Sequence, residues 1–384
     1  MALTVGIIGL PQSGKTTLFN ALTRAGADIS GYPTSTVQAN RAVVEVPDER
    51  LGTLADIFHP RKVVPATVEF VDVAGIGQAA EGAKREGLSA EFLGHIRNAD
   101  ALAIVVRCFN NPAAPHPAGS IDAARDLDEL LTELVLTDLA SVDKRFESTG
   151  RKAKSGDKKL IEELEFLKRL REHLNEGLPV SSFAYASTEE ATLRELFPLT
   201  LKPRLYVVNA GEDVLGAAGA LLEGDGARAE SNELACVAAV RERARAEDAT
   251  IVAVSSKLEA ELGELPEDDA AEYLAALGLP KLGADRVIQA GYRALNLISF
   301  LTAGEDEVRA WTVTQGMKAP AAAGKIHSDF ERGFIRAEVV HYNDLMADDG
   351  SMKTAREHGH IRLEGKDYVV RDGDIIEYRF NVSK

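Results

Sequence analysis

The stretch GLPQSGKT at residues 9–16 decides the fold of this protein. It matches the pattern G-x-x-x-x-G-K-[ST], in which backbone N–H groups of a glycine-rich loop cradle phosphate oxygens at the start of a helix. The apolar run 4–8 before it predicts a buried strand, and residues 17–25 after it carry Leu18 and Leu22 at helical spacing. Because the motif requires this strand–loop–helix context, the sequence predicts a phosphate-binding P-loop.

The rest of the chain alternates strand-like and helical patterns. Near-continuous apolar runs, rich in β-branched residues, predict parallel strands that are covered on both faces. These runs lie at residues 66–71, 101–106, 204–208 and 250–254. Strands that alternate with helices are typical of a doubly wound α/β sheet, so the fold class expected is an α/β P-loop NTPase domain.

Residues 126–200 interrupt this alternation with two long amphipathic helices, 126–143 and 158–175, joined by a polar segment at 148–157. The pattern predicts a helical hairpin that projects from the sheet. From residue 144 to 171 the chain has ten Lys/Arg and five Asp/Glu, a local charge of +5. This charge favours either a solvated helix face or a contact with an anionic partner such as RNA.

After residue 296 the chain changes to short strand-like stretches separated by turns, such as the one at 372–374. The stretches lie at 309–314, 335–340, 368–370 and 375–380. They predict a small β-rich domain. The domains expected are a P-loop domain in two parts (1–125 and 201–296), a helical insertion (126–200) and a C-terminal domain (297–384).

The composition is that of an ordinary globular protein, with 45% hydrophobic and 27% charged residues among 384. The net charge of 44 − 60 = −16 excludes a generally basic nucleic-acid coat. Cys108 and Cys236 lack a CxxC pattern, so neither a disulfide framework nor a structural zinc site is expected. His358 and His360 are interpreted as exposed polar chain and not as a metal site, since no third ligand is evident. No apolar run approaches the roughly 18 residues that cross a bilayer, so we expect a soluble, cytoplasmic protein without membrane contact.

Several polar residues follow predicted strands, where parallel sheets bind ligands. In the P-loop, Lys15 is expected to reach the β- and γ-phosphates and the Thr16 hydroxyl to bind Mg²⁺. Asp72, which begins a D-x-x-G pattern, would face the Mg²⁺ shell, and the Gly75 amide would contact the γ-phosphate. The loop 32–36 offers hydroxyls, of which a threonine would complete the metal shell as a switch element.

The stretch NAGE at 209–212 stands where guanine-specific proteins carry N-K-x-D. Glu212 is one methylene longer than the aspartate that binds guanine, and the lysine stem that packs on the base is missing. We therefore expect the guanine contact to be lost. Ser255, Ser256 and Lys257 end the next strand and are a weaker candidate for backing the base.

The usual residue for hydrolysis is missing. Many small GTPases place glutamine directly after D-x-x-G to orient the attacking water, but here Ile76 cannot form hydrogen bonds. His116, in the loop 112–117, is a candidate replacement because its imidazole can titrate near neutral pH. The alternative is a loop histidine that is merely exposed to solvent.

With these residues identified, the sequence resembles the YchF group of Obg-like ATPases over essentially its whole length. In the P-loop part the shared features are GLPQSGKTT (9–17), PATVEFVDVAG (65–75), EGL (86–88) and LKPRLYVVNAGED (201–213). In the last part they are AGKIHSDFERGFIRAEV (323–339) and EGKDYVVRDGDIIEYRFNV (364–382). So many specific segments in the same order make coincidence an inadequate explanation.

The resemblance implies a helical coiled-coil insertion in the P-loop domain and a C-terminal TGS domain, a ubiquitin-like β-grasp module. It implies a preference for ATP over GTP, associated with Asn209 and Glu212. It implies Mg²⁺ bound through Thr16 and Thr36, with Asp72 close to the ion but not in direct contact with it. The partner that it implies is the ribosome (50S or 70S), contacted through the basic helical insertion and the TGS domain.

Two positions bear on how hydrolysis would occur. A loop histidine matching His116 is implied to be the hydrolytic group. The family usually has asparagine where this chain has Gln12, and in potassium-stimulated relatives that asparagine helps to hold K⁺ in place of an arginine finger. Gln12 carries the same amide on a side chain that is one methylene longer. Mg²⁺ is therefore the expected cofactor, and whether K⁺ is a second one stays open.

The function expected is a Mg²⁺-dependent ATPase switch that slowly hydrolyses ATP to ADP and phosphate and associates with ribosomes in translation or stress responses. The alternatives are a nucleotide-regulated ribosome- or RNA-binding module with incidental hydrolysis, and a conventional GTPase. The nucleotide-binding residues expected are Gly9, Gln12, Ser13, Gly14, Lys15, Thr16, Thr17, Gly75, Asn209 and Glu212.

Overall fold

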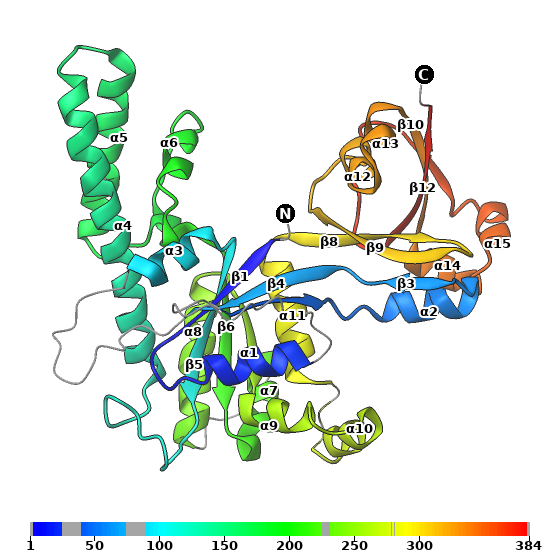
Figure 1. The fold of residues 1–384 in the computed structure, drawn as a ribbon, viewed down its shortest axis with the longest axis horizontal. Helices are drawn as coiled ribbons and strands as arrows, with labels where there is room; N and C mark the ends of the chain where they lie inside the picture. Colours follow the sequence, from blue (N-terminus) through cyan, green and yellow to red (C-terminus); the bar gives the residue numbers. More distant parts are fainter. Residues whose placement is uncertain are drawn as a thin grey trace. The chain divides into compact units, whose positions relative to one another are not determined.

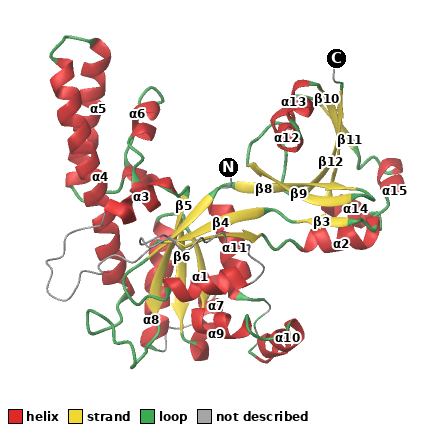
Figure 2. Cartoon of the chain, viewed as in Figure 1, coloured by secondary structure: helices red, strands yellow, loops and turns green. Residues whose placement is uncertain are grey.

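The computed structural model describes residues 3–24, 40–73, 90–224, 231–277, 279 and 281–381. The chain divides into two compact units. The larger unit contains Leu3–Ala42 and Glu69–Val287, and the smaller contains Met1–Ala2, Val43–Val68 and Ile288–Lys384. The described residues form two six-stranded sheets (Figures 1 and 2). The P-loop therefore falls in the larger unit, and the C-terminal residues fall in the smaller one.

The sheet that carries the P-loop has the strand order β2-β4-β1-β5-β6-β7. Its strands are β1 (Thr4–Ile8), β2 (Asn40–Glu45), β4 (Thr67–Asp72), β5 (Ala101–Cys108), β6 (Arg204–Ala210) and β7 (Thr250–Val254). The pairs β1–β4, β1–β5, β5–β6 and β6–β7 are all parallel. This order confirms the doubly wound α/β class, and it brings the carboxyl ends of β1, β4, β5 and β6 to one edge of the sheet.

Helices cover both faces of this sheet (Figure 2). They include α1 (Lys15–Arg24), α3 (Ala90–Asn98), α7 (Leu215–Glu223) and α8 (Asn232–Ala246). Three more helices follow β7, namely α9 (Ser256–Leu262), α10 (Glu267–Ala276) and α11 (Gly283–Ala294). Strands β1, β5 and β6 are buried along their whole length. Ile104 and Tyr206 of the sheet pack with Leu130 and Val237 in one hydrophobic core. This burial explains why the strands are nearly continuous apolar runs.

The helical insertion begins with α4 (Ala123–Ala153) and α5 (Lys158–Asn175), which lie side by side as a hairpin (Figure 1). The prediction of a polar joint at 148–157 is wrong for most of its length, because α4 continues through it. Thr149 is buried in this part of α4 and donates a hydrogen bond to Glu163 of α5 at 3.1 Å. The extra helical turns are thus stabilised by contacts with the partner helix, which local sequence polarity does not reveal.

Asp138 anchors the hairpin to the sheet. Its buried carboxylate accepts hydrogen bonds from the N–H of Leu199 at 2.7 Å and from the N–H and hydroxyl of Thr200 at 2.9 and 2.7 Å. These residues lie in the short 3₁₀ turn η2 (Leu199–Leu201), directly before β6. The other short elements of the insertion are η1 (Val180–Ser182) and α6 (Glu190–Glu195).

The smaller unit contains a mixed sheet of order β11-β10-β12-β8-β9-β3. Its strands are β3 (Lys62–Val64), β8 (Leu297–Ala303), β9 (Glu307–Thr314), β10 (Phe334–His341), β11 (Arg362–Glu364) and β12 (Asp374–Phe380). Its helices are α2 (Glu49–Phe58), α12 (Ala319–Ile326), α13 (Ser328–Arg332), α14 (Tyr342–Ala347) and α15 (Met352–Glu357). The strand predicted at 368–370 is wrong, since only an isolated bridge joins Val369 to Lys318. The reason is local: Asp374 accepts hydrogen bonds from the Tyr368 hydroxyl and the Arg371 N–H, which turns the segment away from strand pairing.

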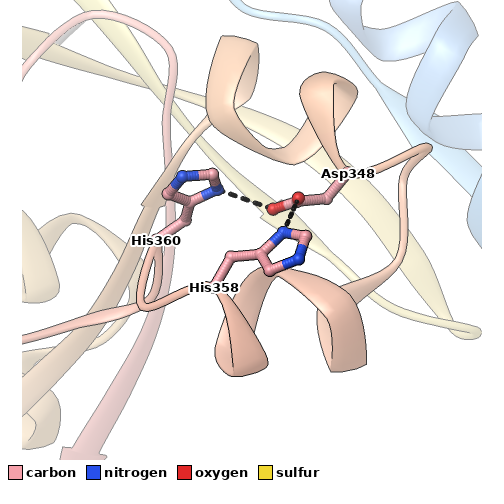
Figure 3. A group of neighbouring side chains, drawn as sticks. All are labelled: Asp348, His358 and His360. Carbon is pink, nitrogen blue, oxygen red and sulfur yellow. Dashed lines mark hydrogen bonds and ion pairs between the residues drawn. The ribbon is translucent and has the colours of Figure 1, made fainter.

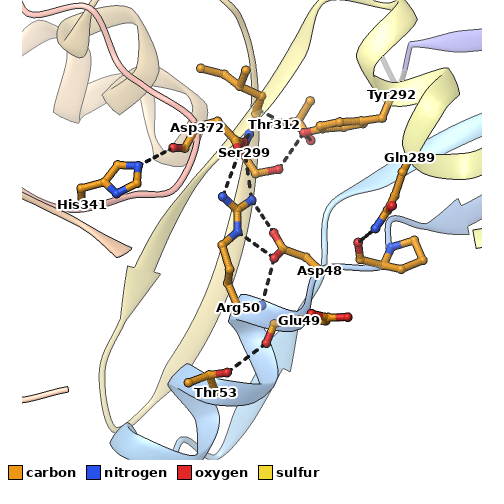
Figure 4. A network of polar contacts seen from close by, with 12 residues as sticks. Asp48, Glu49, Arg50, Thr53, Gln289, Tyr292, Ser299, Thr312, His341 and Asp372 are labelled. Atoms are coloured by element: carbon orange, nitrogen blue, oxygen red, sulfur yellow. Dashed lines mark hydrogen bonds and ion pairs between the residues drawn. The ribbon is translucent and has the colours of Figure 1, made fainter. Parts of the chain in front are cut away.

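A polar network joins residues 43–68 to the C-terminal part of the smaller unit (Figure 4). Arg50, in the first turn of α2, forms ion pairs with Asp48 at 2.7 Å and with Asp372 at 2.8 Å. Asp372 also accepts a hydrogen bond from the Ser299 N–H at 2.9 Å. The network adds to the parallel pairing of β3 with β9, which joins the same early segment to the C-terminal residues.

None of the helices in the described parts of the chain has the length and apolarity that a membrane crossing requires.

Candidate functional site

The loop between β1 and α1 holds its shape through close backbone approach. Gly14 has a φ of 93°, a left-handed value that favours glycine, and an added Cβ would overlap the Asn209 side-chain amide. Gln12 has a φ of 62° and an exposed side chain. The Ser13 hydroxyl is buried and has no hydrogen-bond partner in the described structure. The strained loop thus leaves a buried polar atom whose partner a ligand would supply.

Lys15 lies inside this loop. Its ammonium donates hydrogen bonds to the carbonyls of Gly9 at 3.1 Å and Leu10 at 2.9 Å, and its side chain is almost completely buried. Burial lowers the pKa of Lys15 to about 8, while the nearby Asp72 carboxylate opposes this shift. The site therefore contains a buried cation that two neutral carbonyls compensate only in part, and a phosphate group would stabilise its charged form.

Thr16, in the first turn of α1, meets Asp72 at the end of β4. The Thr16 hydroxyl donates a hydrogen bond to Asp72 Oδ2 at 2.9 Å. Asp72 Oδ1 is buried and has no hydrogen-bond partner in the described structure. Burial raises the pKa of Asp72, and the contacts with Thr16 and Lys15 oppose that rise. A hydroxyl and a carboxylate with a free buried oxygen are the hard oxygen donors that Mg²⁺ prefers, so these residues fit such an ion.

Asn209 connects three elements at this edge. Its buried side-chain amide donates a hydrogen bond to the Ser13 carbonyl at 2.9 Å, and its oxygen accepts one from the Ser256 N–H at 2.9 Å. The same side chain thus links the end of β6 to the P-loop and to the start of α9. Both polar atoms of the amide are engaged in bracing the protein, a role that the motif pattern alone does not indicate.

Glu212 lies three residues further, in the 3₁₀ turn η3 (Glu212–Val214). It accepts a hydrogen bond from the Tyr273 hydroxyl at 2.8 Å, and this bond raises the pKa of Tyr273. Glu212 also lines an open groove of about 460 Å³ together with residues of η3, α7 and the chain after α10. The groove walls are Asp213, Leu215, Gly216, Ala217, Leu277 and Leu279. Asn209 therefore contacts the P-loop and α9, whereas Glu212 contacts Tyr273 and lines the groove.

His116 is buried and packs beside the P-loop. Its Nε2 lies 2.9 Å from Asp126 Oδ2, and its Nδ1 accepts a hydrogen bond from the Ala118 N–H at 3.2 Å. Because Nδ1 accepts, the neutral ring carries its proton on Nε2 and donates it to Asp126. The alternative of a solvent-exposed loop histidine is wrong, since only 6% of the side chain is exposed. The imidazole shares a small cavity with Leu10 and other P-loop residues.

Arg107 is a residue of the site that the sequence analysis missed. It lies at the end of β5, is 3% exposed, and donates to the carbonyls of Ala114 at 2.7 Å and Gln12 at 3.5 Å. Its guanidinium also lies 4.6 Å from the centre of the Phe109 ring. The sequence feature that could have identified it is an arginine at the end of an otherwise apolar strand. Its hydrogen bonds tie the His116 loop to the P-loop backbone.

Three of the predicted residues lie outside the part of the chain that the structure describes: Thr36, Gly75 and Ile76. The remaining predicted residues of the P-loop gather at the edge formed by β1, β4 and β6, where Thr17 is exposed on the first turn of α1. The structure thus brings Ser13, Lys15, Thr16, Asp72 and Asn209 together and places His116 next to them.

Comparisons with known proteins agree with this architecture. A family model described as "50S ribosome-binding GTPase" matches residues 4–145. A second, for the C-terminal part of YchF GTPases and described as "Protein of unknown function (DUF933)", matches residues 297–381. Both the P-loop part and the C-terminal part are therefore similar to known families.

Full-length relatives are also found. The chain is 45% identical to "Ribosome-binding ATPase YchF" of Bacillus subtilis (strain 168) and 41% identical to the protein of that name from Escherichia coli O157:H7, over 382 residues and 100% of each chain. The solved "Structure of the Schizosaccharomyces pombe YchF GTPase" is similar with a TM-score of 0.80 and 32% identity, covering 98% of this chain and 97% of that one. Identity of this extent over the whole length of both chains shows that the protein belongs to the YchF family.

Proposed function

We propose that the protein is a Mg²⁺-dependent ATPase switch that associates with ribosomes. The observation that carries the proposal is the group formed by the buried Lys15 and Asp72 with the exposed Thr16, which presents a cation and oxygen donors beside the P-loop backbone. Bound ATP would replace the carbonyls of Gly9 and Leu10 as the partner of the Lys15 ammonium. Hydrolysis would yield ADP and phosphate and remove the γ-phosphate contacts that hold the switch loops.

Mg²⁺ would be held by the Thr16 hydroxyl, with Asp72 accepting hydrogen bonds from water on the ion. When bound, the ion neutralises charge between the β- and γ-phosphates. Thr36 is the second hydroxyl proposed, on the basis of the resemblance described above. The present Thr16–Asp72 hydrogen bond of 2.9 Å keeps both groups in place for this purpose. K⁺ beside Gln12 stays a separate proposal, which a comparison of turnover in Na⁺ and K⁺ buffers tests.

ATP is proposed as the preferred nucleotide, although some relatives are named ATPases and one is titled a GTPase. The bacterial relatives are named ATPases, whereas the yeast structure is titled a GTPase. Asn209 is almost completely buried and its amide braces Ser13 and Ser256, and Glu212 is one methylene longer than the aspartate that binds guanine. Calorimetric titration of ATP and GTP in the presence of Mg²⁺ tests base choice, and tighter binding of GTP would contradict the proposal.

His116 is proposed as the group that acts on the attacking water. In the structure both of its ring nitrogens are engaged, with Asp126 and with the Ala118 N–H. The imidazole must therefore release the Ala118 N–H from Nδ1 before that nitrogen can accept a proton, and we expect turnover below about 1 s⁻¹ without a partner. His116→Ala should lower single-turnover hydrolysis at least about tenfold and leave ATP affinity unchanged. Equal hydrolysis by both proteins would reject His116.

A second function is favoured by the same engaged histidine: a nucleotide-regulated binding module in which hydrolysis is incidental. The two possibilities separate in a ribosome co-sedimentation assay with ATP, ADP or no nucleotide. Lys15→Ala should abolish the dependence of binding on nucleotide in either case. His116→Ala should leave release from the ribosome intact if hydrolysis is incidental, and should prevent release if hydrolysis resets the switch.

The ribosome contact is proposed to include the tip of the α4–α5 hairpin. Five exposed basic residues gather there: Arg151, Lys152, Lys154, Lys158 and Lys159. Such a cluster in an acidic protein suits the phosphate backbone of RNA. Because ribosomes are its proposed partner, we also place the protein in the cytoplasm.

Charge reversal tests the hairpin contact. Glutamate at Arg151, Lys152 and Lys154 should weaken ribosome association and reduce its salt dependence. A matched control reverses three exposed charges outside the hairpin and the C-terminal domain, Arg61, Arg245 and Arg293, with the same change of net charge. Equal loss of binding in both triple variants would mean that net charge and not the hairpin tip is responsible.

A further inference from the structure

A cluster of two histidines and one aspartate lies in the smaller unit, away from the P-loop residues in the chain (Figure 3). His358 Nδ1 lies 2.6 Å from Asp348 Oδ1, and His360 Nδ1 lies 2.7 Å from Asp348 Oδ2. One ligand atom from each residue lies within 4.8 Å of the others. We propose that Asp348, His358 and His360 form a binding site for a divalent transition-metal ion, with Zn²⁺ as the ion that fits best.

The exposure predicted for His358 and His360 is confirmed, but the premise that no third ligand lies near them is wrong. The interpretation against a metal site depended on that premise. The third ligand is Asp348, which is ten residues before His358 and directly follows α14. Local spacing could not reveal it, because the turn between α14 and α15 brings the aspartate back to the end of α15.

The backbone fixes the convergence of the three side chains. His358 directly follows α15, and Gly359 comes next with a left-handed φ of 77°. The N–H of His360 then bonds to the carbonyl of Ala355 at 2.9 Å, which reverses the chain and directs both imidazoles to one side. The other end is equally fixed, since the N–H of Asp348 bonds to the Leu345 carbonyl at 3.1 Å.

Burial and exposure are distributed as a metal site requires. The Asp348 side chain is 2% exposed, whereas His358 and His360 are 59% and 39% exposed. The carboxylate is therefore held rigidly, and solvent can occupy the open positions of an ion that the imidazoles bind.

The donor set selects the metal. Two imidazole nitrogens and one carboxylate match sites in which three protein ligands and a water hold Zn²⁺. Mg²⁺ and Ca²⁺ prefer oxygen ligands, so they are poor candidates. Zinc bonds of about 2.0–2.2 Å place tetrahedral ligand atoms about 3.3 Å apart. The present N–O distances of 2.6 and 2.7 Å must therefore widen by about 0.6 Å, which the exposed imidazoles can do.

The competing explanation is a hydrogen-bonded clamp in which the imidazoles only donate to Asp348. Glutamine at position 358 or 360 separates the two, because its amide can still donate to the carboxylate but is a poor ligand for zinc. His327→Gln is the matched control. His327 is an exposed histidine of the same unit whose Nδ1 also lies near an aspartate, Asp329, at 3.5 Å.

The experiment uses the full chain, stripped of metal and kept in excess Mg²⁺ without nucleotide. Zn²⁺ is titrated against a chromophoric chelator, and Co²⁺ is titrated while its visible absorption is recorded. We expect one tight equivalent of Zn²⁺, a Co²⁺ spectrum of low coordination number, and a melting temperature of the smaller unit that rises with Zn²⁺. H358Q and H360Q should each weaken Zn²⁺ binding about tenfold or more, and H327Q should bind like the wild type.

Zn²⁺ affinity that H358Q and H360Q retain would overturn the metal site and leave the clamp. The same conclusion would follow from a wild-type protein that does not compete with the chelator. A near-ultraviolet circular dichroism spectrum shows whether each variant is folded. If H358Q unfolds the unit, the variant is replaced by an NMR measurement on the wild-type protein, which records long-range ¹H–¹⁵N correlations of the imidazoles. Zn²⁺ must then shift the Nδ1 signals of His358 and His360 together. Signals that do not shift reject the proposal. Neither result bears on the ATPase proposal.

Discussion

Replacement of Asn209 by alanine separates the two roles that this residue could have. The structure assigns its amide to the P-loop carbonyl of Ser13 and to the Ser256 N–H, both at 2.9 Å. Alanine removes both hydrogen bonds in a buried place and leaves a donor and an acceptor unpaired. At about 1–1.5 kcal/mol for each bond, the free energy of unfolding should fall by about 2–3 kcal/mol. For a domain of this size, that loss lowers Tm by about 4–12 °C.

The effect on nucleotides is the sharper part of this prediction. Because Asn209 braces the phosphate loop, the Kd values for ATP and GTP should rise together by about tenfold or more, which is about 1.4 kcal/mol. Their ratio should change by less than about twofold. Glu212→Gln is the matched control: it leaves Tm within about 1 °C, since the residue lies on a 3₁₀ turn at the surface, and it changes the ATP/GTP ratio.

Calorimetric titration of both nucleotides with Mg²⁺, together with thermal denaturation, measures all of these quantities. Asn209→Asp extends the test, since aspartate keeps the acceptor for Ser256 but points a negative charge at the Ser13 carbonyl. It should weaken both nucleotides at least as much as alanine does. A selective loss of one base in Asn209→Ala, with stability unchanged, would refute the bracing role.

Three further outcomes are expected. Burial lowers the pKa of Lys15 to about 8, and a bound phosphate would restore its charge. ATP binding at pH 9 should therefore take up a proton and should weaken as pH rises above 8. Calorimetry in buffers of different ionisation enthalpy measures this uptake, and ATP binding without it would contradict the lowered pKa. Asp138→Ala leaves the Leu199 and Thr200 donors unpaired, so it should lower the free energy of unfolding, measured in urea, by about 3–5 kcal/mol. A decrease below about 1 kcal/mol would contradict the role of Asp138 as the anchor of the hairpin. Arg50→Met should cost only about 1 kcal/mol by the same measurement, because its partner Asp372 is half exposed.

The P-loop domain is predictable because its determinants are local. An apolar run, a glycine-rich loop and an amphipathic helix occur within 25 residues, and each is specified by neighbouring positions. The parallel strands are predictable for the same reason, since strands covered on both faces have no polar side to obscure the pattern. Asp72 and Asn209 could likewise be placed near the P-loop, because the ends of parallel strands meet at one edge.

Other features could not be predicted because they depend on partners far along the chain. The last turns of α4 look polar and are helical because Thr149 contacts Glu163 of α5. Arg107 resembles a strand-end residue until its guanidinium is seen to bond to Gln12 and Ala114. Residues 43–68 join the C-terminal residues through the pairing of β3 with β9 and through the Arg50–Asp372 ion pair, whose members are 322 residues apart.

The sequence by itself thus determined the P-loop, the doubly wound sheet around it and the family to which the chain belongs, because each of these is written in consecutive residues. Only the tertiary structure decided what individual side chains do: that Asn209 braces the loop, that His116 is held by Asp126, and that Asp348 completes a cluster with His358 and His360. The physical reason is that a hydrogen bond or a metal ligand depends on distances of about 2–3 Å between atoms that the chain brings together only on folding.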